Sequence, residues 1–284
     1  MRISGFAPLV VALLALSPLR FVAAQDLRTV TTSKQYRGQD TLRANIDFAA
    51  GKLKIRAGNP AWLYRMELSY DPERFAPVSR LDSAGKSLQL GVKSSGESGI
   101  TVSAKDDQPQ DGTIELNPAT AISLDVTLGA AEADLDLGGL KISSAVIQTG
   151  ASQTTLRFSS PNRIACERLE ISVGAAEFSA LQLGNASCRT VKLDGGVGGV
   201  LVDLTGAWKN DANLTLSVAL GQITLRLPRD VGIELTLDRF LSNFSPDGFV
   251  RDGRVYRSSN FTTAARKLTL ALTSTMGGVN VEWK

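Results

Sequence analysis

The chain of 284 residues carries 31 Lys and Arg against 28 Asp and Glu, and it contains no histidine. This near-neutral charge, with both signs interspersed along the chain, argues against nucleic-acid binding, which needs a strongly basic face. The missing histidine excludes Ser-His-Asp and Cys-His nucleophiles, histidine-ligated zinc and a histidine general base. A content of 26 glycines with 6% aromatic residues is typical of a turn-rich, all-β protein with aliphatic cores.

The first 24 residues have the pattern of a secretory signal peptide. Arg2 gives a cationic start, residues 6–16 form an apolar core, and Val22-Ala23-Ala24 supplies small residues for cleavage. A proline and an arginine follow the apolar core, so the segment is too short to anchor the chain in a bilayer. We expect cleavage near Ala24, export to the periplasm or cell surface, and no integral membrane segment in the mature chain.

Residues 25–115 are expected to form an irregular, β-rich N-terminal half. Alternating apolar residues flank Gly51 on both sides, which gives the order strand, glycine, strand. Further alternation at 64–70 and 88–92 predicts two more strands. Prolines and the polar stretch 93–112 interrupt the period. The sequence leaves open whether this half shares a core with the rest of the chain.

Residues 116–284 repeat one unit of about 22 residues, a period typical of solenoids. Each unit contains two short strands of alternating apolar residues separated by a glycine, at 129, 150, 174, 196 and 221. We therefore predict an all-β, β-helix-like solenoid of stacked coils, with an antiparallel sandwich as the alternative. The predicted inward ladders contain Leu124, Ala145, Leu169, Val191 and Leu216 in the first strand, and Leu135, Leu156, Leu181, Val202 and Leu225 in the second.

The outward residues support the same register. Opposite charges on adjacent coils are favourable cross-strand neighbours, although each exposed pair contributes only about 0 to 1 kcal/mol. On the first strand Glu170 aligns with Lys192. The residues expected at one step of the second strand are Asp136, Arg157, Gln182, Asp203 and Arg226.

Cys166 and Cys188, the only two cysteines, lie one repeat apart. The same offset carries Leu169 onto Val191. Cysteines of exported proteins usually pair, and equal positions on neighbouring coils lie about 4.8 Å apart, within the range of a disulfide. We predict a structural disulfide, with two buried free thiols as the alternative.

Residues 239–262 interrupt the repeat with a segment rich in aromatic residues and arginine, before the strand pattern returns at 268–272 and 277–283. One interpretation is an end cap, because a solenoid must cover its last coil. The other is a partner-binding surface, since apolar patches with arginines mark interfaces. The residues expected in this cap or partner-binding site are Phe240, Phe244, Phe249, Arg251, Arg254 and Tyr256.

Carboxylates are the remaining candidates for acid–base chemistry. Glu132, Asp134 and Asp136 alternate on one strand face, a spacing compatible with acid and base roles in glycoside hydrolysis. Their small neighbours would not raise the pKa of one member, so a solvated acidic edge is the favoured interpretation. The glycine run 195–200 fits neither a dinucleotide loop, because Leu201 replaces the third glycine, nor a calcium-binding repeat. We expect no catalytic residue, cofactor or metal.

Two segments carry a family resemblance. Residues 218–232 (VALGQITLRLPRDVG) and 277–283 (GGVNVEW) resemble the toast-rack proteins, which are bacterial envelope proteins similar to the C-terminal domain of LiaF-like cell-wall-antibiotic response proteins. Residues 63–75 resemble the N-terminal part of that family. The resemblance implies a β-helix-like fold, export, a link to envelope stress in membrane-anchored members, and no catalytic residues. This chain departs from those members because it has a signal-peptide pattern and no transmembrane pattern.

These observations together predict an exported bacterial envelope protein that acts as a non-catalytic scaffold or binding module. Its partner would be another envelope protein or a cell-wall polymer. The alternative is a carboxylate-dependent, polysaccharide-active β-helix enzyme with Glu132, Asp134 and Asp136 as its acid cluster.

Overall fold

The computed structural model describes residues 27–82, 86–95, 110–175, 177–244 and 247–284, except for the side chains of 239–242. The predicted signal peptide lies outside the described residues. The described chain is all-β, as predicted: its strands form one continuous 17-stranded sheet, accompanied by the helical turn α1 (Leu183–Ala186). No helix in these ranges has the length and apolarity to cross a membrane.

The strands differ widely in length, and the longest of them span a whole coil. In chain order they are β1 (Arg28–Gln35), β2 (Thr41–Ala57), β3 (Trp62–Tyr70), β4 (Phe75–Leu81), β5 (Ser87–Ser94), β6 (Asp111–Leu116), β7 (Ala121–Asp136), β8 (Lys141–Thr149), β9 (Gln153–Arg157), β10 (Cys166–Ala175), β11 (Glu177–Leu181), β12 (Cys188–Asp203), β13 (Ala212–Leu227), β14 (Gly232–Phe244), β15 (Phe249–Asp252), β16 (Val255–Ser258) and β17 (Lys267–Trp283).

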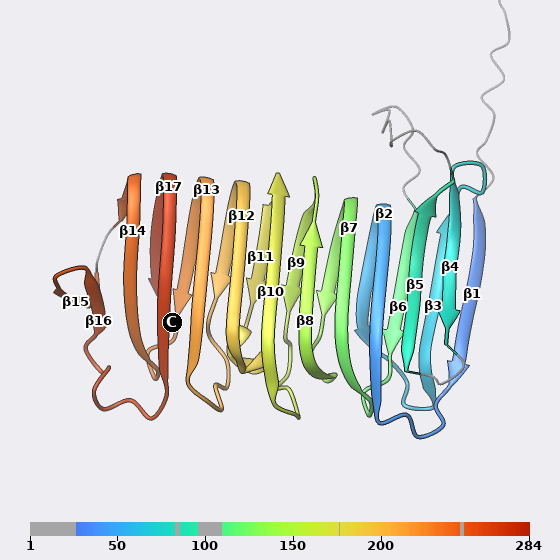
Figure 1. Cartoon of the computed structure of the whole chain (residues 1–284), viewed down its shortest axis with the longest axis horizontal. Coiled ribbons are helices and arrows are strands. Elements are labelled where there is room, and N and C mark those ends of the chain that lie inside the picture. Colours follow the sequence, from blue (N-terminus) through green and yellow to red (C-terminus); the bar gives the residue numbers. More distant parts are fainter. Residues whose placement is uncertain (1–26, 83–85, 96–109, 176, 245–246) are drawn as a thin grey trace, which may run out of the picture.

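Each coil contributes to two faces of the molecule. In β7, residues 121–128 pair with β8, whereas residues 132–136 pair with β9. The first halves of the coils form the front face of Figure 1 and the second halves form the back face. Neighbouring coils run parallel, so equivalent residues of successive coils lie side by side in rows.

The stack departs from chain order at both ends. β2 lies against β7, with Ile46 opposite Val126, although four strands separate them in the sequence. At the other end β17 lies between β13 and β14, with Leu272 opposite both Leu216 and Leu237. Figure 1 shows the same arrangement, with blue β2 beside green β7 and red β17 among the orange strands. β17 therefore lies one coil inside the C-terminal end of the stack, whereas beyond β2 the N-terminal end continues with β5 and β4 on one face and with β6, β3 and β1 on the other.

The structure differs from the predicted break of the repeat at Arg239. β14 continues parallel to β17 through Phe244, with Leu241 opposite Met276. Main-chain hydrogen bonds to β17 keep this part extended even though its side chains no longer follow the aliphatic pattern. After Phe244 the chain turns back, and β16 pairs antiparallel with the outer edge of β14 while β15 pairs with β16.

One aliphatic core runs along the stack between the two faces. It includes residues from Leu42 to Val279, so the N-terminal half shares it. Full burial of such a side chain contributes roughly 1.5 to 3 kcal/mol relative to exposure. One row of this core, in which no side chain is more than 1% exposed, contains Ile46, Val126, Ile147, Ile171, Leu193, Leu216 and Leu272.

The predicted inward ladder of the second strand is wrong at β11. Ala180 is fully buried and lies opposite Leu156 and Val202, whereas the half-buried Leu181 lies opposite Arg157. The 22-residue separation of the two cysteines also relates Ala180 to Val202, so the smaller residue points inward. Gln182 leaves the outward row and precedes α1 in a left-handed conformation with φ 56°.

The predicted disulfide between Cys166 and Cys188 is present. The two residues lie opposite each other in β10 and β12, with their Cα atoms 4.3 Å apart, and each is 1% exposed. Glu170 lies opposite Lys192, also as predicted. The disulfide thus joins two adjacent coils at equal positions.

The outward charges lie in the predicted register but form different pairs. Asp136 lies opposite Arg157, yet the Asp136 carboxylate accepts hydrogen bonds from the backbone N–H groups of Gly138 and Ser159. Asp203 likewise accepts from the N–H of Thr205. An aspartate at a strand end readily caps the turn two residues further on, which removes it from the cross-strand ion pair.

Candidate functional site

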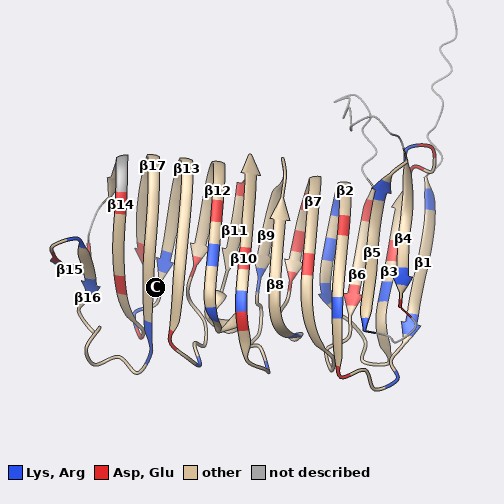
Figure 2. Cartoon of the chain, in the orientation of Figure 1, with Lys and Arg blue, Asp and Glu red and all other residues tan. Residues whose placement is uncertain are grey.

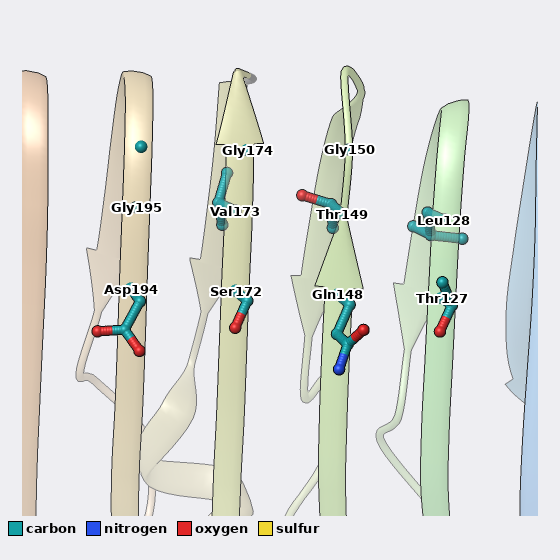
Figure 3. Close-up of a pocket in the computed structure, with 11 residues that line it drawn as sticks. Thr127, Leu128, Gln148, Thr149, Gly150, Ser172, Val173, Gly174, Asp194 and Gly195 are labelled. Carbon is teal, nitrogen blue, oxygen red and sulfur yellow. The ribbon is translucent and has the colours of Figure 1, made fainter.

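A shallow groove of about 740 Å³ crosses the front face along the row direction, over β7, β8, β10 and β12. Figure 3 shows four polar side chains of its rim in one row, below the other labelled residues of the lining. The pairing of the strands places these residues in register. From one end of the groove to the other they are Thr127, Gln148, Ser172 and Asp194.

Glycines at the bend of each coil keep the groove open. A Cβ atom on Gly150, Gly174 or Gly196 would lie 3.0, 2.9 or 2.8 Å from the carbonyl oxygen of the bend glycine on the preceding coil. These are closer contacts than side chains normally make, so the coils approach here only because the residues are glycine. The groove lining therefore includes backbone that no side chain covers.

Thr149 is the polar residue of an otherwise apolar row in the groove lining. It lies between Leu128 and Val173 and is 6% exposed. Its Oγ1 atom is buried and has no hydrogen-bond partner among the described residues. Figure 3 shows the hydroxyl directed along the row toward the strand of Val173. A buried polar group without a partner costs about 1 to 3 kcal/mol, a cost that valine would avoid.

The charged residue at one end of the groove, Asp194, forms an ion pair with Lys192. The Asp194 carboxylate lies 2.7 Å from the Lys192 ammonium. The hydrogen bond to Asp194, and then the charge of that carboxylate, raise the pKa of Lys192 above its ordinary value. The three other rim residues are uncharged, so the groove presents mainly hydroxyl, amide and backbone groups.

Glu132, Asp134 and Asp136 are each engaged by a neighbour. Glu132 lies 3.5 Å from Lys52, Asp134 forms a short ion pair with Arg157, and Asp136 accepts backbone hydrogen bonds. They lie on the back face, away from the front groove. In the described part of the chain no group of three Asp, Glu or Cys side chains could hold a metal ion.

The aromatic segment lies at the C-terminal end of the stack. Phe244 and Phe249 contact the buried Tyr256 edge to face, with ring centroids 5.1 and 6.3 Å apart, and Phe249 also packs on Trp283 at 5.0 Å. The Arg251 guanidinium lies over the Tyr256 ring at 5.7 Å. Of the two remaining predicted members, Arg254 is exposed, and the side chain of Phe240 is not among those that the structure describes.

Comparison with protein families gives the chain its identity. Residues 23–168 match the family model described as the N-terminal domain of toast_rack, DUF2154. The chain belongs to the toast-rack family. No curated protein matches this toast-rack chain.

Several crystal structures resemble this toast-rack protein. A candidate cell adhesion protein from Clostridium sporogenes is 17% identical, with a TM-score of 0.47, 91% of this chain covered and 100% of the other. A candidate adhesin from Bacteroides fragilis is 9% identical, with a TM-score of 0.39 and coverages of 91% and 99%. A candidate adhesin from Parabacteroides distasonis is also 9% identical, with a TM-score of 0.40 and coverages of 91% and 98%. Identities this low transfer no residue role.

The sequence did not reveal the groove of this toast-rack protein. Thr149 stands in the alternating pattern after Ala145 and Ile147, so its inward position was predictable. The sequence feature that could have drawn attention to this position is a threonine in an inward row, directly before a bend glycine. The sequence could not show that the hydroxyl lacks a partner.

Proposed function

We propose that this protein is an exported, non-catalytic binding module of the bacterial envelope, and that it binds a neutral polysaccharide chain along the front groove. The observation that carries the proposal is the row of exposed polar side chains Thr127, Gln148 and Ser172, which the strand pairing places side by side along the groove. Exposed hydroxyl and amide groups at a regular spacing offer a repeating polymer a hydrogen-bonding contact on each coil.

The shape of the groove suits an extended polymer. It crosses four coils at a rung spacing of about 4.8 Å, so it presents similar groups at regular intervals along the stack. A linear chain with a repeating unit can contact several rungs at once, and many weak contacts then add up. A compact small molecule would use only a part of this open surface, since small-molecule sites are usually concave.

The chemistry of the lining favours a neutral, hydroxyl-rich chain. Hydroxyl and amide side chains such as Ser172 and Gln148 both donate and accept hydrogen bonds, as sugar hydroxyls do. Asp194, the one charged residue of the lining, is already paired with Lys192. A strongly charged polymer would find no free counter-charge in the groove lining, which favours a neutral cell-wall polysaccharide over an acidic one.

Export is supported by two independent features. The disulfide between Cys166 and Cys188 is typical of proteins that fold outside the cytoplasm, and residues 1–24 have the signal-peptide pattern. Cleavage near Ala24 would release the chain to the periplasm or cell surface. Through the toast-rack relationship we further propose a role connected with cell-envelope stress, as in the LiaF-like proteins.

The C-terminal aromatic segment is proposed as the cap of the stack. Phe244, Phe249 and Tyr256 contact one another, and Phe249 packs on Trp283 of the last strand. Side chains engaged in this way stabilise the end coil. The groove, not this segment, is the proposed contact with the polymer.

Cosedimentation with purified, protein-free cell walls tests the proposed function. Wild type should sediment with the walls and should be released by soluble neutral glycan fragments. The double variant Gln148→Ala/Ser172→Ala should lose most of this binding. The control Asn213→Ala/Thr215→Ala changes two exposed residues on the same face beyond the groove and should bind normally. Absence of wild-type binding, or equal loss in both variants, contradicts the proposal.

A further inference from the structure

β1 forms the outermost strand of the stack at its N-terminal end (Figure 1). Its pairing within the described strands is with β3 alone, antiparallel from Arg28 opposite Tyr70 to Gln35 opposite Trp62. The other edge of this eight-residue strand therefore presents main-chain N–H and C=O groups to a further strand. Such an edge is a ready template for pairing with another chain.

The other outer strands carry features that oppose pairing. β4, the outer strand of the front face at the same end, contains Pro77, which lacks the N–H that a ladder needs. At the opposite end β16 covers part of β14, and the outermost β15 has only four residues, two of them charged. β1 contains no proline, and its central residues Thr31, Thr32 and Ser33 are uncharged.

We infer that β1 pairs with β1 of a second copy of this chain, antiparallel and around a two-fold axis at Thr32. In a continuous antiparallel sheet, directly opposite residues point to the same face. Successive residues of one strand point to opposite faces, so a two-fold axis between two residues would pair residues from different faces. The axis must therefore pass through a residue. Only an axis at Thr31 or at Thr32 keeps seven of the eight residues paired.

Charge selects between these two registers. An axis at Thr31 places Arg28 opposite Lys34 twice, and like charges directly opposite are destabilising. An axis at Thr32 places Lys34 opposite Val30 and leaves no like-charged pair face to face. The edge is thus self-complementary in one register.

The hydroxyl of Thr32 supports the same register independently. Thr32 lies in the half-buried row of β1, and its Oγ1 atom is buried without a hydrogen-bond partner among the described residues. With the axis at Thr32, the two Thr32 side chains become direct cross-strand neighbours. Threonine pairs in this position form hydrogen bonds, so the second copy supplies the missing partner.

The resulting dimer would join two stacks end to end through their back sheets. The front grooves of both copies would stay open, because the groove lies on β7 to β12 and not at the β1 end. The inference is therefore independent of the proposed polysaccharide function.

Single cysteine variants test the register. Thr32→Cys should give a disulfide-linked dimer on mild oxidation, because the two introduced thiols meet at the axis. Thr29→Cys should stay monomeric on a non-reducing gel, since the two copies of residue 29 would lie about 20 Å apart. The native cysteines are paired with each other. Dimers from both variants, or from neither, overturn the inference.

Sedimentation velocity on the unmodified chain provides the second measurement. The mass should rise from one chain to two with increasing protein concentration. Thr32→Val should raise the dimer dissociation constant about tenfold without lowering the melting temperature at concentrations where the chain is monomeric, because the monomer only loses an unpaired hydroxyl. A single-chain mass at every concentration, or an unchanged dissociation constant in Thr32→Val, contradicts the inference.

Discussion

Cys166 and Cys188 are direct neighbours on adjacent parallel strands, with Cα atoms 4.3 Å apart and a disulfide between them. The bond closes a chain segment whose ends are 22 residues apart. It holds two coils in the register that all the inward rows require. The disulfide and the aliphatic rows therefore stabilise the same alignment of β10 and β12.

Removal of the disulfide should lower the free energy of unfolding by about 3 kcal/mol, from the lost constraint on the unfolded chain. The double variant Cys166→Ala/Cys188→Ala, followed by urea unfolding, measures this difference. Wild type in reductant should match the variant. Equal stability of wild type and variant under oxidising conditions would show that the bond does not constrain the unfolded chain.

Thr149→Val should raise the free energy of unfolding by about 1 kcal/mol, because it replaces an unpaired buried hydroxyl with a methyl group of similar size. Thr154→Val is the matched control. Thr154 is also buried, but its hydroxyl is hydrogen-bonded to Ser152 at 3.1 Å, so that variant should lose about 1 kcal/mol. Thermal unfolding of the two variants should therefore shift in opposite directions. A loss of stability in Thr149→Val would mean that its hydroxyl has a partner.

Gly174→Ala should destabilise the stack by about 1 to 3 kcal/mol. Its Cβ would lie 2.9 Å from the carbonyl oxygen of Gly150, a backbone atom that cannot move without separating two coils. Gly199→Ala is the control, since a Cβ there meets no atom within 4 Å, and its stability should stay within about 0.5 kcal/mol of wild type. Chemical denaturation of both variants measures the contrast. Equal effects at the two positions would contradict the close approach of the coils at Gly174.

Glu282 should contribute stability that is lost in acid. The hydrogen bond from Arg226 and then that from Lys284 hold the pKa of Glu282 below its ordinary value. Because its pKa is lower in the folded than in the unfolded chain, the contribution is present above the unfolded pKa and disappears as the pH falls through the folded pKa. Glu282→Gln should therefore show a smaller loss of stability between neutral and acidic pH than wild type.

The matched control for that pH series is Glu177→Gln. Glu177 is exposed on β11, and the structure shows no ion pair for it in the described part of the chain. Its variant should follow the wild-type pH dependence. A Glu282→Gln profile that coincides with wild type at every pH would contradict the role of the Arg226 contact.

The repeat itself was predictable because two independent patterns share one offset. The inward residues Leu169 and Val191 and the cysteines 166 and 188 recur at the same separation, and stacked parallel strands force equal positions into contact. The error at Leu181 arose because the larger apolar side chain was preferred over Ala180, although the offset of the cysteines selected the alanine. In a thin aliphatic core, register is a better guide to burial than side-chain size.

The order of the coils at the two ends was not predictable from alternation. The pattern of β2 shows which residues point inward, but it does not show that Ile46 lies opposite Val126 and not opposite a strand nearer in sequence. The same holds for β17, which lies between β13 and β14. The alternation of apolar residues predicts which face of a strand each side chain lies on. It does not predict which coil lies next to which, because that depends on contacts throughout the stack.

The candidate site was less predictable than the fold. The bend glycines, such as Gly150 and Gly174, were recognised as separators of strands, but the groove that they leave open arises only when four coils lie together. The significance of Thr149 depends on its unpaired hydroxyl, a property of the packed structure. Sequence patterns identify the row and cannot identify the missing partner.

Isothermal titration calorimetry with a neutral cell-wall polysaccharide tests the central claim most directly. Wild type and Asn213→Ala/Thr215→Ala should bind with the same dissociation constant, whereas Gln148→Ala/Ser172→Ala should bind at least tenfold more weakly, because it removes two exposed hydrogen-bonding side chains from the groove. The tenfold change corresponds to about 1.4 kcal/mol, within the range for two hydrogen bonds. Equal binding by wild type and Gln148→Ala/Ser172→Ala, or no binding by wild type, would contradict the assignment of the front groove as the polysaccharide site.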